Sequence, residues 1–239
     1  INNAGTIRSD YRFLNGNTST MAVSGTTTIN LTNTDVGSAI IMGQNGATTY
    51  GGNIAVSNTG GAAGVTFNNT GSASSTLNGS ISIGAGFSSG SLNLYRFDQV
   101  GAIAHNLTLT GSAALVVGPA SEFDGNVNFL SPQIYLNGCV YQGTATIEKN
   151  GATNDGGTGG NTFNGVTTIT NSGSGYLYTG NGSHDTFMSA TTFNNTGSSR
   201  IYIANNHSGE TTTFASTVVL NSNKTSGTDA WSYLIAEGT

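Results

Sequence analysis

The sequence predicts an all-β fold, a parallel β-solenoid wound as a right-handed β-helix of about nine coils with 18 to 27 residues each. Three observations lead to this prediction. A short apolar pattern recurs nine times along the 239 residues. Within each copy apolar and polar residues alternate, as in a strand with one buried face. Strong helix formers are scarce, whereas Gly, Thr, Asn and Ser together account for 128 residues.

The recurring pattern is seven residues long and predicts one strand per coil. Its first position is large and apolar, and its seventh is Ile, Val, Leu or Phe. Its third position is Gly in six copies, Ser in two and His105 in one. Side chains alternate between the faces of a strand, so the odd positions are expected to point inward. The nine copies occupy residues 23–29, 50–56, 77–83, 103–109, 123–129, 141–147, 163–169, 187–193 and 214–220.

A second short apolar strand follows most copies after a turn rich in Gly, Asn and Ser. A single coil of this kind cannot bury its apolar face, but stacked coils form a continuous core. An immunoglobulin-like array would need antiparallel units of about 100 residues, and the short period disfavours it. The second strands are expected at residues 65–67, 92–94, 115–117, 134–136, 176–178, 201–203 and 233–235.

The repeats extend along the whole chain, so residues 1–239 are predicted to form a single solenoid segment of a larger repetitive protein. Residues 1–22, which include the apolar strand around Tyr11 and Phe13, are expected to be the remnant of a preceding coil. Residues 148–161 consist mostly of Gly, Asn, Asp and Thr. That composition predicts a degenerate, loop-rich half-coil.

Charge and composition limit the possible functions. The chain carries 6 basic and 11 acidic residues and a net charge of −5, whereas nucleic-acid binding needs a basic stripe. No run approaches the roughly 20 apolar residues that cross a membrane. The single cysteine, Cys139, excludes an internal disulfide framework and is expected to be buried. We expect an extracellular location, no nucleic-acid partner and no membrane insertion.

The acidic residues do not follow a catalytic pattern. Glu122 and Asp124 flank an inward aromatic residue and should both face solvent, but the aligned coils place no acid beside Asp124. Glu148 and Asp155 are expected to be loop charges. Residues 154–160 resemble one calcium-binding nonapeptide turn, a motif that works only when it is repeated. We therefore assign no catalytic residue and predict that the chain is not an enzyme.

The three histidines are dispersed. His105 occupies an inward position that is otherwise Gly or Ser. His184 and His207 lie in equivalent turns of successive coils, beside Asp185 and Glu210 respectively. A weak metal site could form there, but exposed turn residues are the expected interpretation. No metal ligand, cofactor-binding residue or cofactor is assigned.

An apolar column is predicted on the outside of the second strands. Its members lie between inward positions, and contiguous exposed apolar residues usually mark an association surface. We predict that this face packs against another copy, which gives a homo-oligomer or a bundle of rods. The alternative is that a third strand or a loop of the same coil covers it. The column comprises Val116, Tyr135, Leu177, Tyr202 and Leu234.

The segment TFNGVTTITNSGSGYLY at residues 162–178 is followed by DTF at 185–187 and TFNNTGS at 192–198. This phrase resembles the repeat arrays of large Bacteroidota surface proteins, and the likeness is tight from about residue 160 to 220. Proteins of that kind are typically exported by type IX secretion and act as adhesins or surface filaments. The resemblance implies an adhesive or fibrous role on a cell surface, with another cell, a surface or a polysaccharide as partner. It carries no catalytic motif.

Two other functions remain open. A carbohydrate-active β-helix enzyme, such as a polysaccharide lyase or hydrolase, would need two or more acids converging in one groove. An ice- or glycan-binding solenoid would need regular ranks of threonine on consecutive coils. Thr-x-Thr pairs do occur, for example Thr26 with Thr28, but residues such as Ala55 and Ser82 interrupt the ranks.

Overall fold

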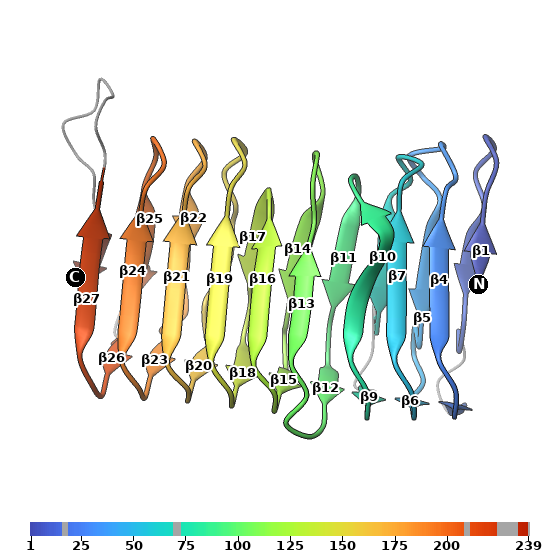
Figure 1. Cartoon of the computed structure of the whole chain (residues 1–239), viewed down its shortest axis with the longest axis horizontal. Coiled ribbons are helices and arrows are strands. Elements are labelled where there is room, and N and C mark those ends of the chain that lie inside the picture. Colours follow the sequence, from blue (N-terminus) through green and yellow to red (C-terminus); the bar gives the residue numbers. More distant parts are fainter. Residues whose placement is uncertain (16–18, 69–72, 208–210, 224–233, 239) are drawn as a thin grey trace.

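The computed structural model describes residues 1–15, 19–68, 73–207, 211–223 and 234–238. All regular structure in these ranges is β, and the strands pair in parallel from one coil to the next. Figure 1 shows the coils stacked along one axis, with the two ends of the chain at opposite ends of a rod. At about 4.8 Å between neighbouring strands, the ten strands of the largest sheet span about 43 Å. The predicted parallel β-solenoid is confirmed. Within the same ranges no helix is long and apolar enough to cross a membrane.

Four sheets form the walls of the rod. Sheet A contains β1 (Asn2–Asn3), β4 (Thr27–Leu31), β7 (Ile54–Asn58), β10 (Ile81–Phe87), β13 (His105–Thr108), β16 (Val127–Ser131), β19 (Ala145–Lys149), β21 (Thr167–Asn171), β24 (Thr191–Asn195) and β27 (Val218–Ser222). Sheet B contains β2 (Asp10–Arg12), β5 (Ala39–Met42), β8 (Gly64–Phe67), β11 (Ser91–Leu94), β14 (Ala114–Val117) and β17 (Gln133–Leu136). Sheet C contains β3 (Met21–Val23), β6 (Thr48–Tyr50), β9 (Ser75–Leu77), β12 (Phe97–Gln99), β15 (Ser121–Phe123), β18 (Cys139–Tyr141), β20 (Thr162–Phe163), β23 (Thr186–Phe187) and β26 (Thr213–Phe214). Sheet D contains β22 (Leu177–Tyr178), β25 (Ile201–His207) and β28 (Leu234–Gly238).

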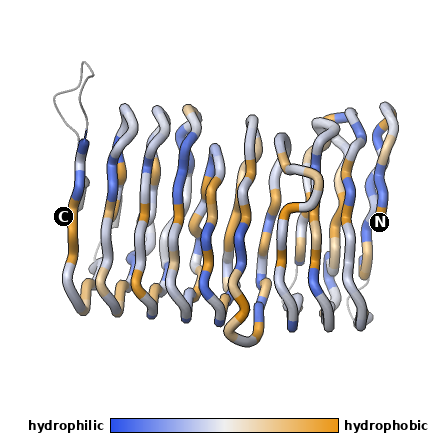
Figure 2. The backbone as a smooth tube through the Cα atoms, in the orientation of Figure 1, coloured by the Kyte–Doolittle hydropathy of each residue, from blue (hydrophilic) through white to orange (hydrophobic). Residues whose placement is uncertain are grey.

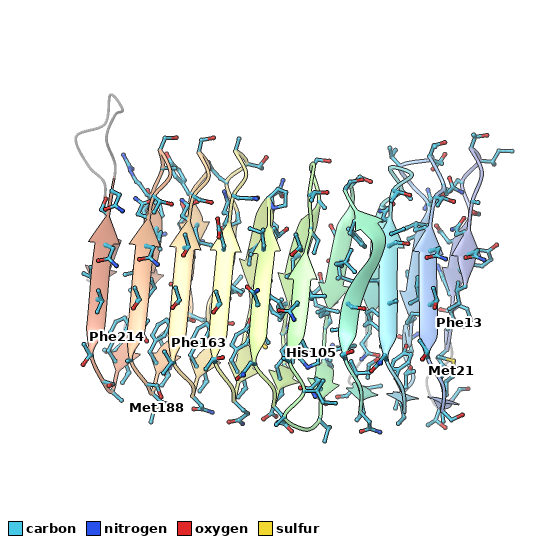
Figure 3. The ribbon with its side chains drawn as sticks, viewed as in Figure 1. Phe13, Met21, His105, Phe163, Met188 and Phe214 are labelled. Carbon is cyan, nitrogen blue, oxygen red and sulfur yellow. The ribbon has the colours of Figure 1, made fainter. Side chains whose placement is uncertain are left out.

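The core consists of inward side chains that stack on their equivalents in the next coil. Ile54 and Ile81, for example, are backbone partners and are at most 1% exposed. Figure 2 shows apolar and polar residues alternating along the strands of sheet A. Figure 3 shows Phe163 and Phe214 at the same height in the rod. These two belong to a column of nearly parallel rings with centroids 4.7, 4.8 and 4.9 Å apart, made by Tyr141, Phe163, Phe187 and Phe214 in that order.

The small third position of the repeat marks a corner where successive coils approach closely. A Cβ added to Gly165 would lie 2.1 Å from the carbonyl oxygen of Gly143, and one added to Gly79 would lie 2.7 Å from that of Gly52. Gly25 holds the same position in the first copy and has nothing within 4 Å. The position is therefore small because the backbone of the preceding coil fills the space that a side chain would need.

Polar side chains at the end of sheet A hold the next corner together. Asn58, Asn171 and Asn195 each donate from Nδ2 to the carbonyl oxygen four residues further on, at 2.9, 3.0 and 2.8 Å. Turn carbonyls have no partner in the strand ladders, so these amides satisfy them. Lys149 takes the same place one coil before Asn171. It is fully buried, and its Nζ donates to the carbonyl oxygen of Gly151 at 2.9 Å.

The predicted copy at residues 103–109 has the wrong register, because Leu107 and not Leu109 pairs with Phe129, the seventh residue of the next copy. Gln99 is the backbone partner of Phe123, and His105 is the partner of Val127. Gln99 therefore holds the first position of this coil, and His105 holds the fifth. The residues between them form a loop (Figure 1), in which Ile103 is 38% exposed.

Gln99 is buried at an apolar position because both ends of its amide are bonded. Its Nε2 donates to the carbonyl oxygens of Val100 and Gly101, both at 2.8 Å, and its Oε1 accepts the N–H of Gly125 at 3.0 Å. These bonds replace the ones to water that burial removes. Because glutamine is polar, the repeat pattern assigns the first position of this coil to Ile103, which is large and apolar, and not to Gln99.

The two irregular parts of the chain also lie within the stack. The first three strands, β1 to β3, add one strand each to sheets A, B and C. Between β19 and β20 the described chain has no strand. Gly159 makes isolated parallel bridges there to Asn137 below and Ser183 above. This coil is therefore linked to its neighbours by fewer ladder bonds than the others.

Candidate functional site

The predicted association column lies on the outer face of sheets B and D, but not with all five residues. Val116 and Tyr135 are backbone partners, and both side chains are half-buried. Tyr202 is 9% exposed. Leu177 is fully buried and pairs with the buried Ile201, so its place in the column is wrong.

The error at Leu177 is one of parity. Hydrophobicity alone does not decide whether Leu177 points inward or whether the two tyrosines that flank it, Tyr176 and Tyr178, do so. In the structure the leucine is inside and the two tyrosines flank it on the outer face. Burying the leucine leaves no hydroxyl without a partner, which favours this choice. Leu234 is the backbone partner of Ile201 in β28, and its side chain lies outside the described residues.

The outer face instead carries a cluster of three tyrosines and one arginine, called the tyrosine cluster below. The rings of Tyr178 and Tyr202 stack with centroids 4.6 Å apart and an angle of 11°. Tyr176 stands at 76° to Tyr202, with centroids 5.5 Å apart. Arg200 lies 5.7 Å from the centre of the Tyr176 ring, and its Nη1 donates to the Tyr202 hydroxyl at 3.1 Å. Burial raises the pKa of Tyr178, and the neighbouring tyrosines raise it further, so its hydroxyl stays protonated at neutral pH.

The residues around the tyrosine cluster are small or uncharged. Tyr135 reaches toward the cluster across Gly156, whose missing Cβ would lie 3.8 Å from Cε1 of Tyr135. The outward positions from β11 to β25 carry one guanidinium and no carboxylate. They are Ser91, Asn93, Ala114, Val116, Gln133, Tyr135, Asn154, Gly156, Tyr176, Tyr178, Arg200 and Tyr202.

The structure brings together two acids that the sequence alignment kept apart. Asp98 and Glu122 are backbone partners on sheet C, and both side chains are half-buried. Burial raises the pKa of Asp98, and the charge of Glu122 raises it further. Gln142 donates from Nε2 to Oε1 of Glu122 at 2.6 Å. Asp124, the predicted companion of Glu122, accepts the N–H of Gly101 at 2.9 Å. The pair was missed because Asp98 belongs to the coil whose register was wrong.

Two acids that were expected on the surface lie inside the rod. Asp155 accepts the N–H of Tyr178 at 2.8 Å. Asp185 accepts the N–H of Asn161 at 2.9 Å and its Nδ2 at 3.0 Å, both through Oδ1. Burial raises the pKa of Asp155 to about 8 and that of Asp185 to about 7. The predictions of a loop charge at Asp155 and an exposed turn residue at Asp185 are therefore wrong.

Asp185 belongs to a polar inward column along sheet C. In this column a side chain accepts the backbone N–H of its neighbour in the preceding coil: Ser121 Oγ accepts from Phe97 at 3.1 Å, and Asn161 Oδ1 accepts from Cys139 at 3.1 Å. Asp185 makes the same bond to Asn161. Cys139 is fully buried, as expected.

The other candidate residues have structural environments. The prediction of a loop charge at Glu148 is wrong, because this residue lies at an outward position of strand β19, where it accepts a hydrogen bond from Oγ of Ser172. His105 is fully buried, and its Nδ1 accepts the N–H of Ile81 at 3.3 Å. Burial lowers the pKa of His105 to about 4, so the ring is neutral at physiological pH.

The predicted turn histidines are only partly visible. His184 is exposed. The side chain of His207 and all of Glu210 lie outside the described residues, so the pairing of these turns is not seen. In the ranges that the structure does describe, no group of three His, Cys, Asp or Glu side chains could hold a metal ion.

The outer face of sheet A lacks long ranks of threonine. One outward column reads Thr28, Ala55, Ser82, Asn106, Asn128, Thr146, Thr168, Thr192 and Val219. Threonine occupies three successive coils of this column, and the interruptions at Ala55 and Ser82 occur where the sequence predicted them.

Comparison of this chain with known protein families, with characterised proteins and with solved structures finds no match. Functional arguments therefore come from the surface chemistry of the rod. Two surfaces stand out: the tyrosine cluster on sheets B and D, and the Asp98–Glu122 pair on sheet C.

Proposed function

We propose that this chain is a rod segment of an extracellular adhesive fibre, without catalytic activity. The observation that carries the proposal is the continuous parallel ladder. Ten strands of sheet A and nine of sheet C follow one another along a single axis, over a core of stacked apolar side chains. Each coil contacts only its neighbours, so such a rod spans distance and resists a pulling force coil by coil.

The surface supports an extracellular role. Only 17 residues are charged, and the outward positions of sheet A are mostly Thr, Ser and Asn. A surface of short polar side chains can bond to a hydrated polymer or to another surface at many equivalent points. The repeat style of residues 162–198, which resembles that of Bacteroidota surface proteins, points in the same direction.

Two experiments test the proposal. Antibodies raised against the purified chain should label intact producing cells, and a cytoplasmic marker on the same cells should stay unlabelled. Beads coated with the chain should attach to cells or surfaces more strongly than beads coated with an unrelated β-solenoid of the same length. Labelling that appears only after the cells are permeabilised contradicts the location, and equal attachment of the two beads contradicts the adhesive role.

Side-by-side association of rods is the second part of the proposal. The apolar column that suggested it has lost Leu177 to the core, which leaves Val116 and Tyr135, both half-buried, and Tyr202, which is 9% exposed. Sedimentation at rising protein concentration measures the association directly. A chain that stays monomeric at millimolar concentration contradicts bundling but leaves the adhesive rod untouched.

A carbohydrate-active enzyme is the second candidate, and the Asp98–Glu122 pair is the observation that favours it. Two carboxyl groups on adjacent coils are separated by about one strand spacing at the backbone, and glycoside hydrolysis uses carboxyl pairs about 5 to 10 Å apart. Release of reducing ends or unsaturated sugars from a panel of polysaccharides tests this function. Activity that disappears in Glu122→Gln and Asp98→Asn replaces the structural proposal.

A further inference from the structure

We propose that the side chains of Lys149 and Asn171 join in an amide (isopeptide) bond, which links two successive coils covalently. The inference goes beyond the proposed function, because it adds a chemical modification that the chain performs on itself. It starts from an unusual residue in the core, the fully buried Lys149. Asparagines hold the equivalent place at the end of the strand in other coils, namely Asn58, Asn171 and Asn195.

The amine of Lys149 has little around it to stabilise a positive charge. Among the described residues its Nζ donates to one acceptor, the carbonyl oxygen of Gly151 at 2.9 Å. An ammonium group that leaves water without full compensation is costly, so burial favours the neutral amine. Burial accordingly lowers the pKa of Lys149, although the charge of Asp155 opposes this effect. A desolvated lysine is a nucleophile, because the neutral amine carries a free lone pair.

Asn171 lies directly beside this amine in the next coil. The two residues are backbone partners in neighbouring strands, about 4.8 Å apart, and both side chains are inside the rod. The Gly151 oxygen, which accepts the Lys149 amine, also accepts the N–H of Gly175 at 3.1 Å. The Gly175 oxygen in turn accepts Nδ2 of Asn171 at 3.0 Å. The flexible stem of lysine lets Nζ move from the Gly151 oxygen to Cγ of Asn171.

The amide of Asn171 is held in a form that favours attack. Its Oδ1 accepts the N–H of Gly173 at 3.2 Å, and this bond strengthens as negative charge builds on the oxygen. Its Nδ2 donates to the carbonyl oxygens of Gly175 and Arg200, both at 3.0 Å. The carbonyl carbon is therefore fixed in one orientation beside the amine, with a donor already in place for its oxygen.

Asp155 supplies the acid that the exchange needs. It is 4% exposed, its Oδ2 has no hydrogen-bond partner among the described residues, and its charge acts on Lys149. Burial raises its pKa to about 8, so a protonated carboxyl group and a neutral amine can exist together at physiological pH.

The reaction exchanges one amide for another. The Nζ lone pair attacks Cγ of Asn171, one proton passes from Nζ to Nδ2 through the Asp155 carboxyl group, and the bond between Cγ and Nδ2 breaks. Ammonia leaves, so no oxidant, cofactor or further reactant is needed. The reaction occurs once in each chain and turns over no substrate.

The bond lies where the rod has the fewest ladder bonds. The described chain has no strand between β19, which ends at Lys149, and β20, and Gly159 makes only isolated bridges there. Because each coil contacts only its neighbours, a pull along the rod acts on every such link in turn. A covalent bond from Lys149 to Asn171 ties β19 to β21 at the start of this stretch.

Mass spectrometry of the purified, denatured chain tests the proposal. The wild-type mass should lie below the mass of the sequence by one ammonia. Cleavage before aspartate should release residues 124–154 and 155–184 as one branched peptide, because the new bond joins the two fragments. Lys149→Met should have the full sequence mass. Lys224→Arg, which changes the other lysine of the chain, should keep the loss of ammonia.

The role of Asp155 has its own variant. Asp155→Asn keeps an acceptor for the N–H of Tyr178 and removes the carboxyl group. Loss of a general acid slows such a reaction by roughly a hundredfold, so this chain should be isolated largely with its full sequence mass. An Asp155→Asn chain with the circular dichroism of wild type and a complete loss of ammonia rejects Asp155 as the proton carrier.

The proposal is overturned if the folded wild-type chain has its full sequence mass, a result that does not depend on whether any variant folds. It is also overturned if Lys149→Met still lacks one ammonia, because an asparagine that cyclises onto its own backbone then explains the loss. Loss of one water instead of ammonia places the bond on a carboxyl group and rejects Asn171. These masses are independent of attachment and cell labelling, so failure of the bond and failure of the adhesive role are separate results.

Discussion

Replacing Asp185 by asparagine should remove part of the pH dependence of the rod's stability. The carboxyl group is fully buried in the polar column of sheet C. Burial raises its pKa from an ordinary value of 3.8 to about 7. The folded chain therefore holds the proton more tightly than the unfolded chain does. The resulting stability is fully present below about pH 4 and is lost as the pH rises through about 7.

The magnitude follows from the two pKa values. A tenfold change in proton affinity corresponds to about 1.4 kcal/mol, so the interval from 3.8 to about 7 amounts to about 4 kcal/mol at most. A pH of 5.5 keeps the chain above its isoelectric point of about 4.8. Between pH 5.5 and 8.5, the contribution of Asp185 to the unfolding free energy should fall by about 2 kcal/mol. Asparagine keeps the acceptor for the Asn161 N–H and cannot ionise.

Urea unfolding followed by circular dichroism at pH 5.5 and 8.5 measures the effect. Wild type should lose about 2 kcal/mol more unfolding free energy between the two conditions than Asp185→Asn does. Asp124→Asn, at an acid outside the core, should keep the wild-type pH dependence. Equal losses in wild type and Asp185→Asn would refute the view that this buried carboxyl is neutral in the folded rod.

Three further outcomes are expected. Phe163→Ala removes one ring from the stack and should cost about 3 to 5 kcal/mol in urea unfolding, so a loss below about 1 kcal/mol contradicts the stacking account. Gly165→Ala should destabilise the rod because its Cβ would meet the preceding coil, whereas Gly25→Ala, at the same repeat position, should not; equal melting temperatures for the two variants contradict the close approach. His105 needs a neutral ring, so stability should fall as the pH drops from 6.5 toward about 4, and His105→Gln, which keeps an acceptor for Ile81, should flatten that fall in an acid titration.

The fold could be predicted from the sequence because one pattern of apolar and small residues recurs in nine copies along the chain. The alternation of large apolar and small residues sets one face inward, and the short period excludes larger units. The repeat could not predict the places where a polar side chain is buried in the core because all its hydrogen bonds are made within the protein. Gln99 is such a residue, and treating its position as apolar moved the register and hid the contact between Asp98 and Glu122.

The candidate surface was predicted in place but not in detail. Val116, Tyr135 and Tyr202 lie on the expected face, while Leu177 does not. Hydrophobicity alone cannot separate a leucine from the tyrosines beside it. Comparison with the next coil offers a usable signal, because Ile201 and Ile203 alternate with Tyr202 and place the aliphatic residues inside. Asp185 gave no such signal, because its burial depends on a bond to the coil below, far away in the sequence.

The loop between Gln99 and His105 takes six steps along the chain where the next coil needs four, from Phe123 to Val127. The strands on either side nevertheless stay in register. The cross-section thus accommodates two extra residues at that bend, which makes the bend a suitable position for grafting a foreign peptide. A scaffold built from such coils could display several inserted peptides along one edge, at distances set by the number of coils between them.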